Sequence, residues 1–283
     1  MIFSLKELTK LFKRVFIQRS HFQKKMSQAF NSFYNDAFYS TAYLNFCYAL
    51  YGRNIPQFNL IDACQWAFFL EEVDGIPKEK DDLFLDLGCG MGHNTLAVSK
   101  MFQLGGVGID FSESAVKRAQ KLKVDHSSDV TFRLGSFHDS SFLEREEKYK
   151  IIFSLDGLYG LKDWEGMLTL LLSRLDIGGK ILIFYSSVLK GSDPESSLAN
   201  SLKTLKKKPI GKSFIFHFND FTKEERCFLE RSDKLLDEFK GFFENEGHTN
   251  LYKIKKDECK KGLFWHQKKR TKRLFTVIEK VSF

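Results

Sequence analysis

Residues 83–100 read LFLDLGCGMGHNTLAVSK, and this stretch decides the fold. It holds an apolar run, then three glycines at alternate positions, then a segment with the spacing of a helix. Glycines at such a turn let backbone N–H groups approach a ligand and point at it from the start of the helix. The pattern therefore predicts a strand, a ligand-binding loop and a helix, in that order.

The loop differs from the common dinucleotide-binding loop in two ways. Its glycines, Gly88, Gly90 and Gly92, are spaced G-x-G-x-G instead of G-x-G-x-x-G. An aspartate, Asp86, also lies inside the apolar run that precedes them. Because a buried carboxylate is costly unless donors surround it, we expect the glycine loop to supply donors to Asp86.

From residue 81 onward, short apolar runs alternate with segments of helical spacing, which is typical of parallel strands joined by right-handed crossovers. The expected strands are 83–87, 106–110, 130–134, 150–155 and 180–186, and the expected helices lie near 93–103, 112–123 and 163–175. A capping box at Thr222 predicts a further helix to about Asn245. Two last strands, near 249–255 and 273–281, are expected to form a hairpin. The expected fold is α/β, a seven-stranded, mostly parallel sheet with helices on both faces.

The segments outside this pattern predict additions to domain 81–283. Residues 1–26 combine basic and apolar side chains at helical spacing, so they form either a basic amphipathic helix for a partner or membrane surface or an extension ahead of Met26. Residues 27–80 are dense in aromatic side chains, which predicts a helical cap. Between 188 and 221 the periodicity fades, and we expect a lid inserted after the fifth strand.

Composition excludes several classes of protein. A chain of 283 residues with 43% hydrophobic residues can bury a full core, which excludes a disordered protein. The sequence has neither an apolar run long enough to span a membrane nor the pattern of a signal peptide. Its five cysteines are scattered, without a C-x-x-C pair. We therefore expect a cytoplasmic protein without a metal site.

The net charge of +8 comes from one stretch, because Lys253 to Arg273 holds ten Lys or Arg against Asp257 and Glu258. Two interpretations stay open. The stretch is either a solvated loop between the last two strands or a surface for phosphates, an acidic ligand or an anionic membrane.

The segment LDLGCGMG (85–92) resembles the first motif of class I S-adenosylmethionine-dependent methyltransferases, which have a Rossmann-like fold. The similarity continues in order to residue 187, through GVGIDFS (106–112), VTFRLGSF (130–137), KIIFSLDGLYGL (150–161) and LDIGGKILIFYSS (175–187). The resemblance implies that the glycine loop wraps the amino-acid part of the cofactor S-adenosylmethionine. It also implies that Asp110 accepts the ribose hydroxyls. The family often has an acidic residue at Ser136, so a hydroxyl replaces it here.

The resemblance therefore implies cofactor contacts at the ends of the first four strands: Asp86, Gly88, Cys89, Gly90, Gly92, Asn94, Asp110, Phe111, Ser136, Phe137 and Leu155. Other roles remain open for three of them. Asp110 also fits a capping box, with Glu113, for the helix that follows. Asn94 fits the first turn of a helix, and Cys89 fits the loop as a small residue.

Methyl transfer from a sulfonium needs no metal, and a base is needed only if the nucleophile keeps a proton. Candidates for orienting the acceptor or taking its proton must lie near the end of the fourth strand. Asp156 and Tyr159 leave that strand directly, and His217 lies in the alternating run SFIFHF (213–218) of the expected lid. The alternative for all three is a structural role.

The acceptor class is inferred from the additions to the fold. A helical cap and a lid are similar to the parts that close small-molecule methyltransferases over a buried acceptor. We therefore expect a methyltransferase that acts on a nitrogen or oxygen of a small molecule. One alternative is an RNA methyltransferase, with the basic stretch and its Phe264, Trp265 and His266 as the footprint. Another is a non-catalytic scaffold with the cofactor fold.

Overall fold

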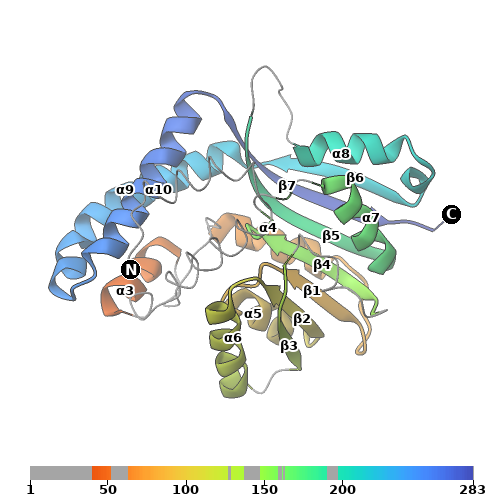
Figure 1. Cartoon of the computed structure of the whole chain (residues 1–283), viewed down its shortest axis with the longest axis horizontal. Coiled ribbons are helices and arrows are strands. Elements are labelled where there is room, and N and C mark those ends of the chain that lie inside the picture. Colours follow the sequence, from red (N-terminus) through yellow and green to blue (C-terminus); the bar gives the residue numbers. More distant parts are fainter. Residues whose placement is uncertain are drawn as a thin grey trace.

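The computed structural model describes residues 40–51, 63–126, 129–136, 147–158, 161, 163–189 and 197–282. Seven strands form one sheet in the order β3-β2-β1-β4-β5-β7-β6 (Figure 1). Their bounds are β1 Leu83–Leu87, β2 Gly105–Asp110, β3 Val130–Leu134, β4 Tyr149–Leu155, β5 Leu175–Val188, β6 Phe214–Asp220 and β7 Thr271–Lys280. Strands β1 to β5 are parallel, and β7 runs antiparallel between β5 and β6. The α/β class and the seven-stranded, mostly parallel sheet are confirmed.

Both faces of the sheet are covered because the central strands are apolar on both sides. Neighbours in β1 divide between the faces: Leu85 belongs to one buried cluster and Phe84 to the other. The helices on the Leu85 face are α7 Trp164–Arg174 and α8 Ser197–Lys206. Those on the Phe84 face are α4 Ala63–Asp74, α5 His93–Phe102 and α6 Glu113–His126. The result is a three-layer arrangement.

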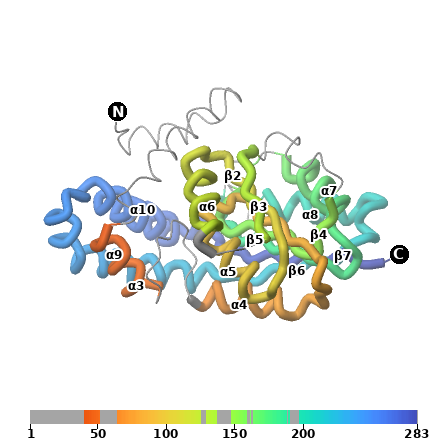
Figure 2. Tube along the Cα trace, turned by 90° about the horizontal axis from the view of Figure 1, so that it is seen from below, coloured from red at the N-terminus to blue at the C-terminus, as the bar shows by residue number. Residues whose placement is uncertain are grey.

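Three helices form a separate module beside the sheet: α3 Thr41–Tyr51, α9 Thr222–Asn245 and α10 Thr249–Gln267. They share a third buried cluster, in which Tyr43 of α3 packs edge-on against Phe243 of α9. Figures 1 and 2 both place this module at one end of the molecule. Because α9 follows β6 and α10 precedes β7, the module joins the sheet at the carboxyl ends of the parallel strands.

Two predictions about the carboxyl-terminal part are wrong. The expected strand 249–255 lies in helix α10, and the strand that pairs with the outer edge of β7 is β6, from which α9 and α10 separate it in the chain. Lysines at buried positions concealed the helical period, since the inward face of α10 carries Lys255 and Lys256 between Leu251 and Cys259. Long lysine side chains can cover apolar surface with their methylene groups. The basic stretch is therefore mostly helix, not a loop.

The expected lid, 188–221, also differs from the prediction. Its last part, Phe214–Asp220, is the edge strand β6 and belongs to the sheet. Residues 197–206 before it form α8, which packs against the sheet. The alternation in SFIFHF is the period of a strand, with Phe214 buried.

The amino-terminal additions are described only in part. Residues 1–26 lie outside the described residues. Within 27–80, α3 packs into the helical module and α4 packs on the sheet. None of the described helices is long and apolar enough to cross a membrane. The division into 1–26, 27–80 and 81–283 stays a prediction.

Candidate active site

The glycine loop after β1 adopts a backbone that favours glycine at three positions. Gly88, Gly90 and Gly92 have φ values of 84°, 53° and 80°. A Cβ on Gly88 would lie 2.5 Å from the Cα of Gly157, so the loop touches the segment that follows β4. The Ser154 hydroxyl joins the same two strand ends by donating to the Leu87 carbonyl at 2.7 Å. The loop is thus fitted between neighbouring strands.

Asp86 is buried in β1, with 3% of its surface exposed. The Thr95 hydroxyl of α5 donates to its carboxyl group at 2.6 Å, so a helix side chain supplies a donor that we expected from the glycine loop. The pKa of Asp86 is raised to about 7. Burial is the largest cause; the Thr95 hydrogen bond lowers the pKa, and nearby Asp110 raises it. The site therefore holds a carboxyl group that titrates near neutral pH.

Asp110 ends β2 and is 4% exposed. Its carboxylate accepts hydrogen bonds from the Gly90 amide at 2.9 Å and the Ser112 amide at 2.8 Å. Burial raises its pKa to about 6, against the lowering effect of backbone hydrogen bonds. The Ser112 hydroxyl accepts a hydrogen bond from the Ala115 amide in the first turn of α6. Asp110 thus links the glycine loop to the end of the neighbouring strand.

The remaining candidate cofactor residues lie at the same edge of the sheet where they are described. Leu155 is buried at the end of β4, Phe111 and Ser136 are half-buried after β2 and β3, and Asn94 is half-buried in the first turn of α5. Burial raises the pKa of the Cys89 thiol well above its usual range, which favours a small loop residue over a nucleophile. Phe137 and Tyr159 lie outside the described residues.

The raised pKa values of Asp86 and Asp110 predict a pH-dependent stability. An aspartate in an unfolded chain has a pKa of about 3.9. Each group therefore stabilises the fold below that pH, and the contribution is lost as the pH rises through about 6 for Asp110 and about 7 for Asp86. We expect the thermal unfolding midpoint to fall as the pH rises from about 4 to about 7. Asp86→Asn should flatten this fall and Asp81→Asn, on the surface, should not; equal slopes in all three proteins would contradict it.

Asp156 follows β4 directly and has a left-handed backbone, with φ 61°. Its carboxylate forms a two-pronged ion pair with the guanidinium of Arg273 on β7, whose Nη2 donates to Oδ2 at 2.7 Å while Nη1 donates to Oδ1. Arg273 is fully buried. Sequence reasoning missed Arg273 because it counted this residue with the basic stretch.

His217 does not reach this edge from a lid, as the sequence suggested. It lies on the edge strand β6, opposite Val277 of β7, with its side chain exposed. Strands β5 and β7 separate it from β4. One histidine in an alternating run does not indicate which strand will pair with the strand that carries it.

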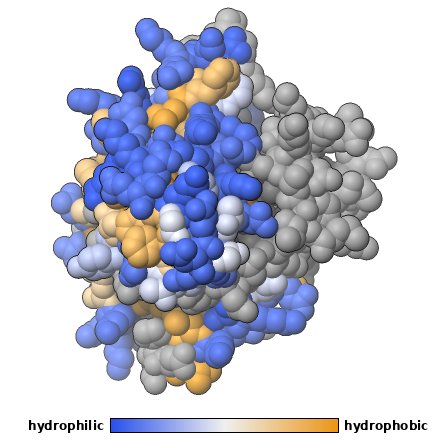
Figure 3. Space-filling model, turned by 90° about the vertical axis from the view of Figure 1, so that its left-hand side faces the viewer, coloured by the Kyte–Doolittle hydropathy of each residue, from blue (hydrophilic) through white to orange (hydrophobic). Residues whose placement is uncertain are grey.

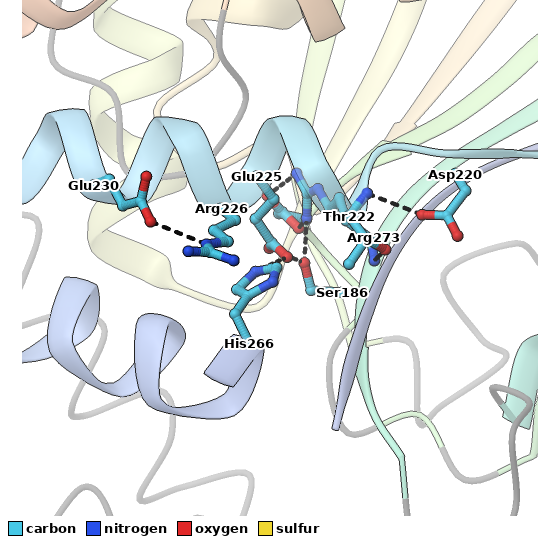
Figure 4. Close-up of polar contacts among 9 residues, drawn as sticks. Ser186, Asp220, Thr222, Glu225, Arg226, Glu230, His266 and Arg273 are labelled. Carbon is cyan, nitrogen blue, oxygen red and sulfur yellow. Dashed lines mark hydrogen bonds and ion pairs between the residues drawn. The ribbon is translucent and has the colours of Figure 1, made fainter. Parts of the chain in front are cut away.

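A chain of polar contacts continues from Arg273 into the helical module (Figure 4). Arg273 Nη1 also donates to the Ser186 hydroxyl at 2.8 Å, and Ser186 donates to Glu225 at 2.5 Å. The other oxygen of Glu225 lies 2.9 Å from Nε2 of His266. The Thr222 hydroxyl accepts from the Arg273 amide, so Thr222 and Glu225 bind β5, β7 and α10 instead of forming the expected capping box.

The basic stretch contributes less surface than its composition suggests. Lys255, Lys256 and Arg273 are buried, and Lys256 forms ion pairs with Asp233 and Asp237 of α9. His266, expected in an RNA footprint, faces Glu225 in the interior. Seen from the helical end, the described residues present a mainly hydrophilic surface with smaller hydrophobic areas (Figure 3).

Two models of known protein families match ranges of this chain that include the glycine loop. A model described as a methyltransferase domain matches residues 78–254. A second model, for protein-L-isoaspartate(D-aspartate) O-methyltransferase, matches residues 6–140. The first match covers more than half of the chain.

Among individual proteins, the chain is 26% identical over 115 residues to phosphoethanolamine N-methyltransferase 1 of Arabidopsis thaliana, covering 41% of this chain and 22% of that protein. It is 29% identical over 150 residues to ajmaline N-methyltransferase of Rauvolfia serpentina, covering 52% and 50%. The fold is similar to that of Haemonchus contortus phosphoethanolamine N-methyltransferase 2, solved with phosphomonomethylethanolamine and S-adenosylhomocysteine. The TM-score is 0.67 at 19% identity, over 88% of this chain and 60% of that one. The chain thus spans between 22% and 60% of the length of these relatives, less than two thirds in each case.

Proposed function

This chain belongs to the methyltransferase domain family, and on that premise we propose that it transfers the methyl group of S-adenosylmethionine to an amine nitrogen of a small molecule. The observation that carries the proposal is the hydrogen bond from the Gly90 amide to the Asp110 carboxylate. It brings a glycine loop with a left-handed backbone to a buried carboxylate at the end of the next strand, where a ribose and an amino-acid group can be held together.

The residues at this edge fit an adenosyl cofactor. The loop from Gly88 to Gly92 would surround its amino-acid part, Asp110 would accept its ribose hydroxyls, and Ser136 would contact its adenine. Phe137, outside the described residues, remains a candidate from the sequence for the same contact. When bound, the cofactor supplies a methyl group already activated on a sulfonium. The protein then contributes mainly by holding donor and acceptor close and aligned, which is worth about 7–11 kcal/mol in favourable cases.

The charge at this edge favours cations. The buried carboxyl groups of Asp156 and Glu225 already face Arg273 and His266, while those of Asp86 and Asp110 have no cation beside them among the described contacts. A bound cation would favour the ionised forms of Asp86 and Asp110, whose pKa values burial raises, and would be stabilised by them in turn. A sulfonium donor and an amine acceptor both match this charge, whereas an alcohol acceptor gains less.

The named relatives support the choice of a nitrogen acceptor. The curated plant proteins that the chain resembles are both N-methyltransferases, one acting on phosphoethanolamine and one on ajmaline. We therefore propose a small amine as the acceptor class, with an oxygen acceptor as the alternative.

Replacing Asp110 with alanine should weaken the binding of S-adenosylhomocysteine by about 10-fold to 100-fold, since a hydrogen bond to a charged group contributes about 1.5–3 kcal/mol. Isothermal calorimetry measures this change. The matched control is Glu113→Gln, which removes an exposed carboxylate three residues away in α6. The Glu113→Gln control and the unaltered protein should bind S-adenosylhomocysteine with the same affinity.

The same titration decides the proposal as a whole. If the unaltered protein releases no heat with S-adenosylmethionine or S-adenosylhomocysteine, but does with a nicotinamide or a flavin, the proposed function is wrong. If donor binding is intact, assays with phosphoethanolamine and ajmaline, following the release of S-adenosylhomocysteine, test the acceptor class.

A further inference from the structure

The segment after β4 lies beside the glycine loop and also begins a polar path into the helical module. Gly157 is so close to Gly88 that a side chain on either would clash. The residue before it, Asp156, therefore adjoins the donor loop. Its left-handed backbone is uncommon outside glycine, although aspartate adopts it more often than most residues. Such outliers persist only where surrounding structure holds them, and they concentrate at functional sites.

Contacts from two neighbouring strands, β5 and β7, hold Asp156. Its amide donates to the Phe184 carbonyl of β5 at 3.1 Å. Its carboxylate is gripped by the fork of Arg273, which lies over the Phe184 ring at 4.4 Å. A guanidinium fork fixes both the position and the plane of a carboxylate, which a lysine ammonium would not. The orientation of Asp156 thus depends on where Arg273 is held.

Arg273 is held in turn by the helical module. Ser186 bridges it to Glu225, and Glu225 contacts His266 near the end of α10. Glu225 lies in the first turn of α9, where the helix dipole favours a negative charge. Figure 4 shows these side chains meeting where α9, α10 and β7 converge. The path leads from the base of the module to the edge where the donor would bind.

We propose that Arg273, Ser186, Glu225 and His266 are positioning residues, which orient Asp156 and the turn after β4 toward the acceptor amine. This inference rests on the proposed function. It assigns the helical module a part in catalysis: a change at the far end of the path, at Glu225 or His266, misplaces the acceptor without altering the grip on the donor.

The test compares Glu225→Gln and His266→Gln with a matched control on the same helix. Glu230→Gln removes the carboxylate of an exposed ion pair with Arg226, whose side chains are 46% and 60% exposed. With phosphoethanolamine or ajmaline as acceptor, both network variants should lower kcat by about 10-fold to 100-fold, because small misplacement is costly in aligned transfer. Their affinity for S-adenosylhomocysteine, measured by calorimetry, should match that of the control.

Combination with Asp156→Asn tests whether the path acts as one unit. Among the described contacts, Arg273 and Ser186 link the carboxyl groups of Asp156 and Glu225. If the path works as proposed, the double variant Asp156→Asn/Glu225→Gln loses no more than about 3-fold beyond the worse single variant, since coupled residues are non-additive. Fully multiplicative losses would overturn the proposal.

Hydrogen exchange tests the same path even if the enzyme methylates neither phosphoethanolamine nor ajmaline. In the protein without donor, amides of residues 150–158 should exchange faster in both network variants than in Glu230→Gln. Unchanged exchange there, or unchanged kcat in both variants, overturns the inference. Loss of donor binding by the unaltered protein would instead count against the proposed function.

Discussion

Replacing Arg273 with methionine should lower the free energy of unfolding by about 3–5 kcal/mol, which is what removal of one partner from a buried ion pair costs. Arg273 is fully buried, and its guanidinium contacts Asp156 and Ser186. Methionine matches the length of the apolar stem but leaves the Asp156 carboxylate, which is 6% exposed, without its cation. A large effect is expected because the carboxylate cannot turn to water without moving the end of β4.

Urea unfolding followed by circular dichroism measures the loss. The control is Arg226→Met in α9, whose exposed ion pair with Glu230 should contribute at most about 1 kcal/mol. The double variant Asp156→Leu/Arg273→Met removes both charges and should recover part of the stability lost in Arg273→Met. A loss below about 1 kcal/mol in Arg273→Met would show that the pair is not desolvated as its burial indicates.

Replacing Gly88 with alanine should abolish measurable donor binding and lower the free energy of unfolding by about 2–4 kcal/mol. The added Cβ would lie 2.5 Å from the Cα of Gly157, a backbone atom that cannot move away as a flexible side chain would. The φ of +84° adds strain for any residue with a side chain. The loop and the turn after β4 would have to separate, and the loop amides would lose their positions.

Gly241→Ala, in the same chain, is expected to have the opposite effect on stability and no effect on donor binding. Gly241 lies in α9, and a Cβ there meets nothing within 4 Å. Alanine at this helical position should raise the free energy of unfolding by up to about 1 kcal/mol and leave donor binding unchanged. Calorimetry with S-adenosylhomocysteine and urea unfolding distinguish the two variants. If Gly88→Ala bound the donor as tightly as Gly241→Ala does, the loop would not form the donor site.

Local patterns were sufficient for the strands that carry the candidate cofactor site. The apolar runs predicted β1 and β3 with their observed bounds, and the alternation with helical segments predicted that the strands are parallel. A glycine loop after a strand must lie at the carboxyl edge of a parallel sheet, so the neighbourhood of Gly90 and Asp110 followed as well. Each of these features depends on residues within one strand–loop–helix unit.

Prediction from the sequence was less successful where side chains that are usually exposed are buried in the fold. Lysines on the inward face of α10 masked a helix, and the strand period of β6 was mistaken for a lid. Asp156 was chosen as a candidate, yet its partner Arg273 is 117 residues away and was counted as part of a surface charge. Nothing in either local sequence shows that the two charges meet.

What the sequence by itself determined is the glycine loop, the strand before it and the parallel direction of the first five strands, because these depend on backbone conformation and on the apolar period within short strand–loop–helix units. What only the tertiary structure decided is which charges are buried and paired. Burying Arg273, Glu225 and His266 together is favourable only when strands β5 and β7 and helices α9 and α10 bring their partners within hydrogen-bond distance. That condition involves the whole fold, so local sequence does not reveal it.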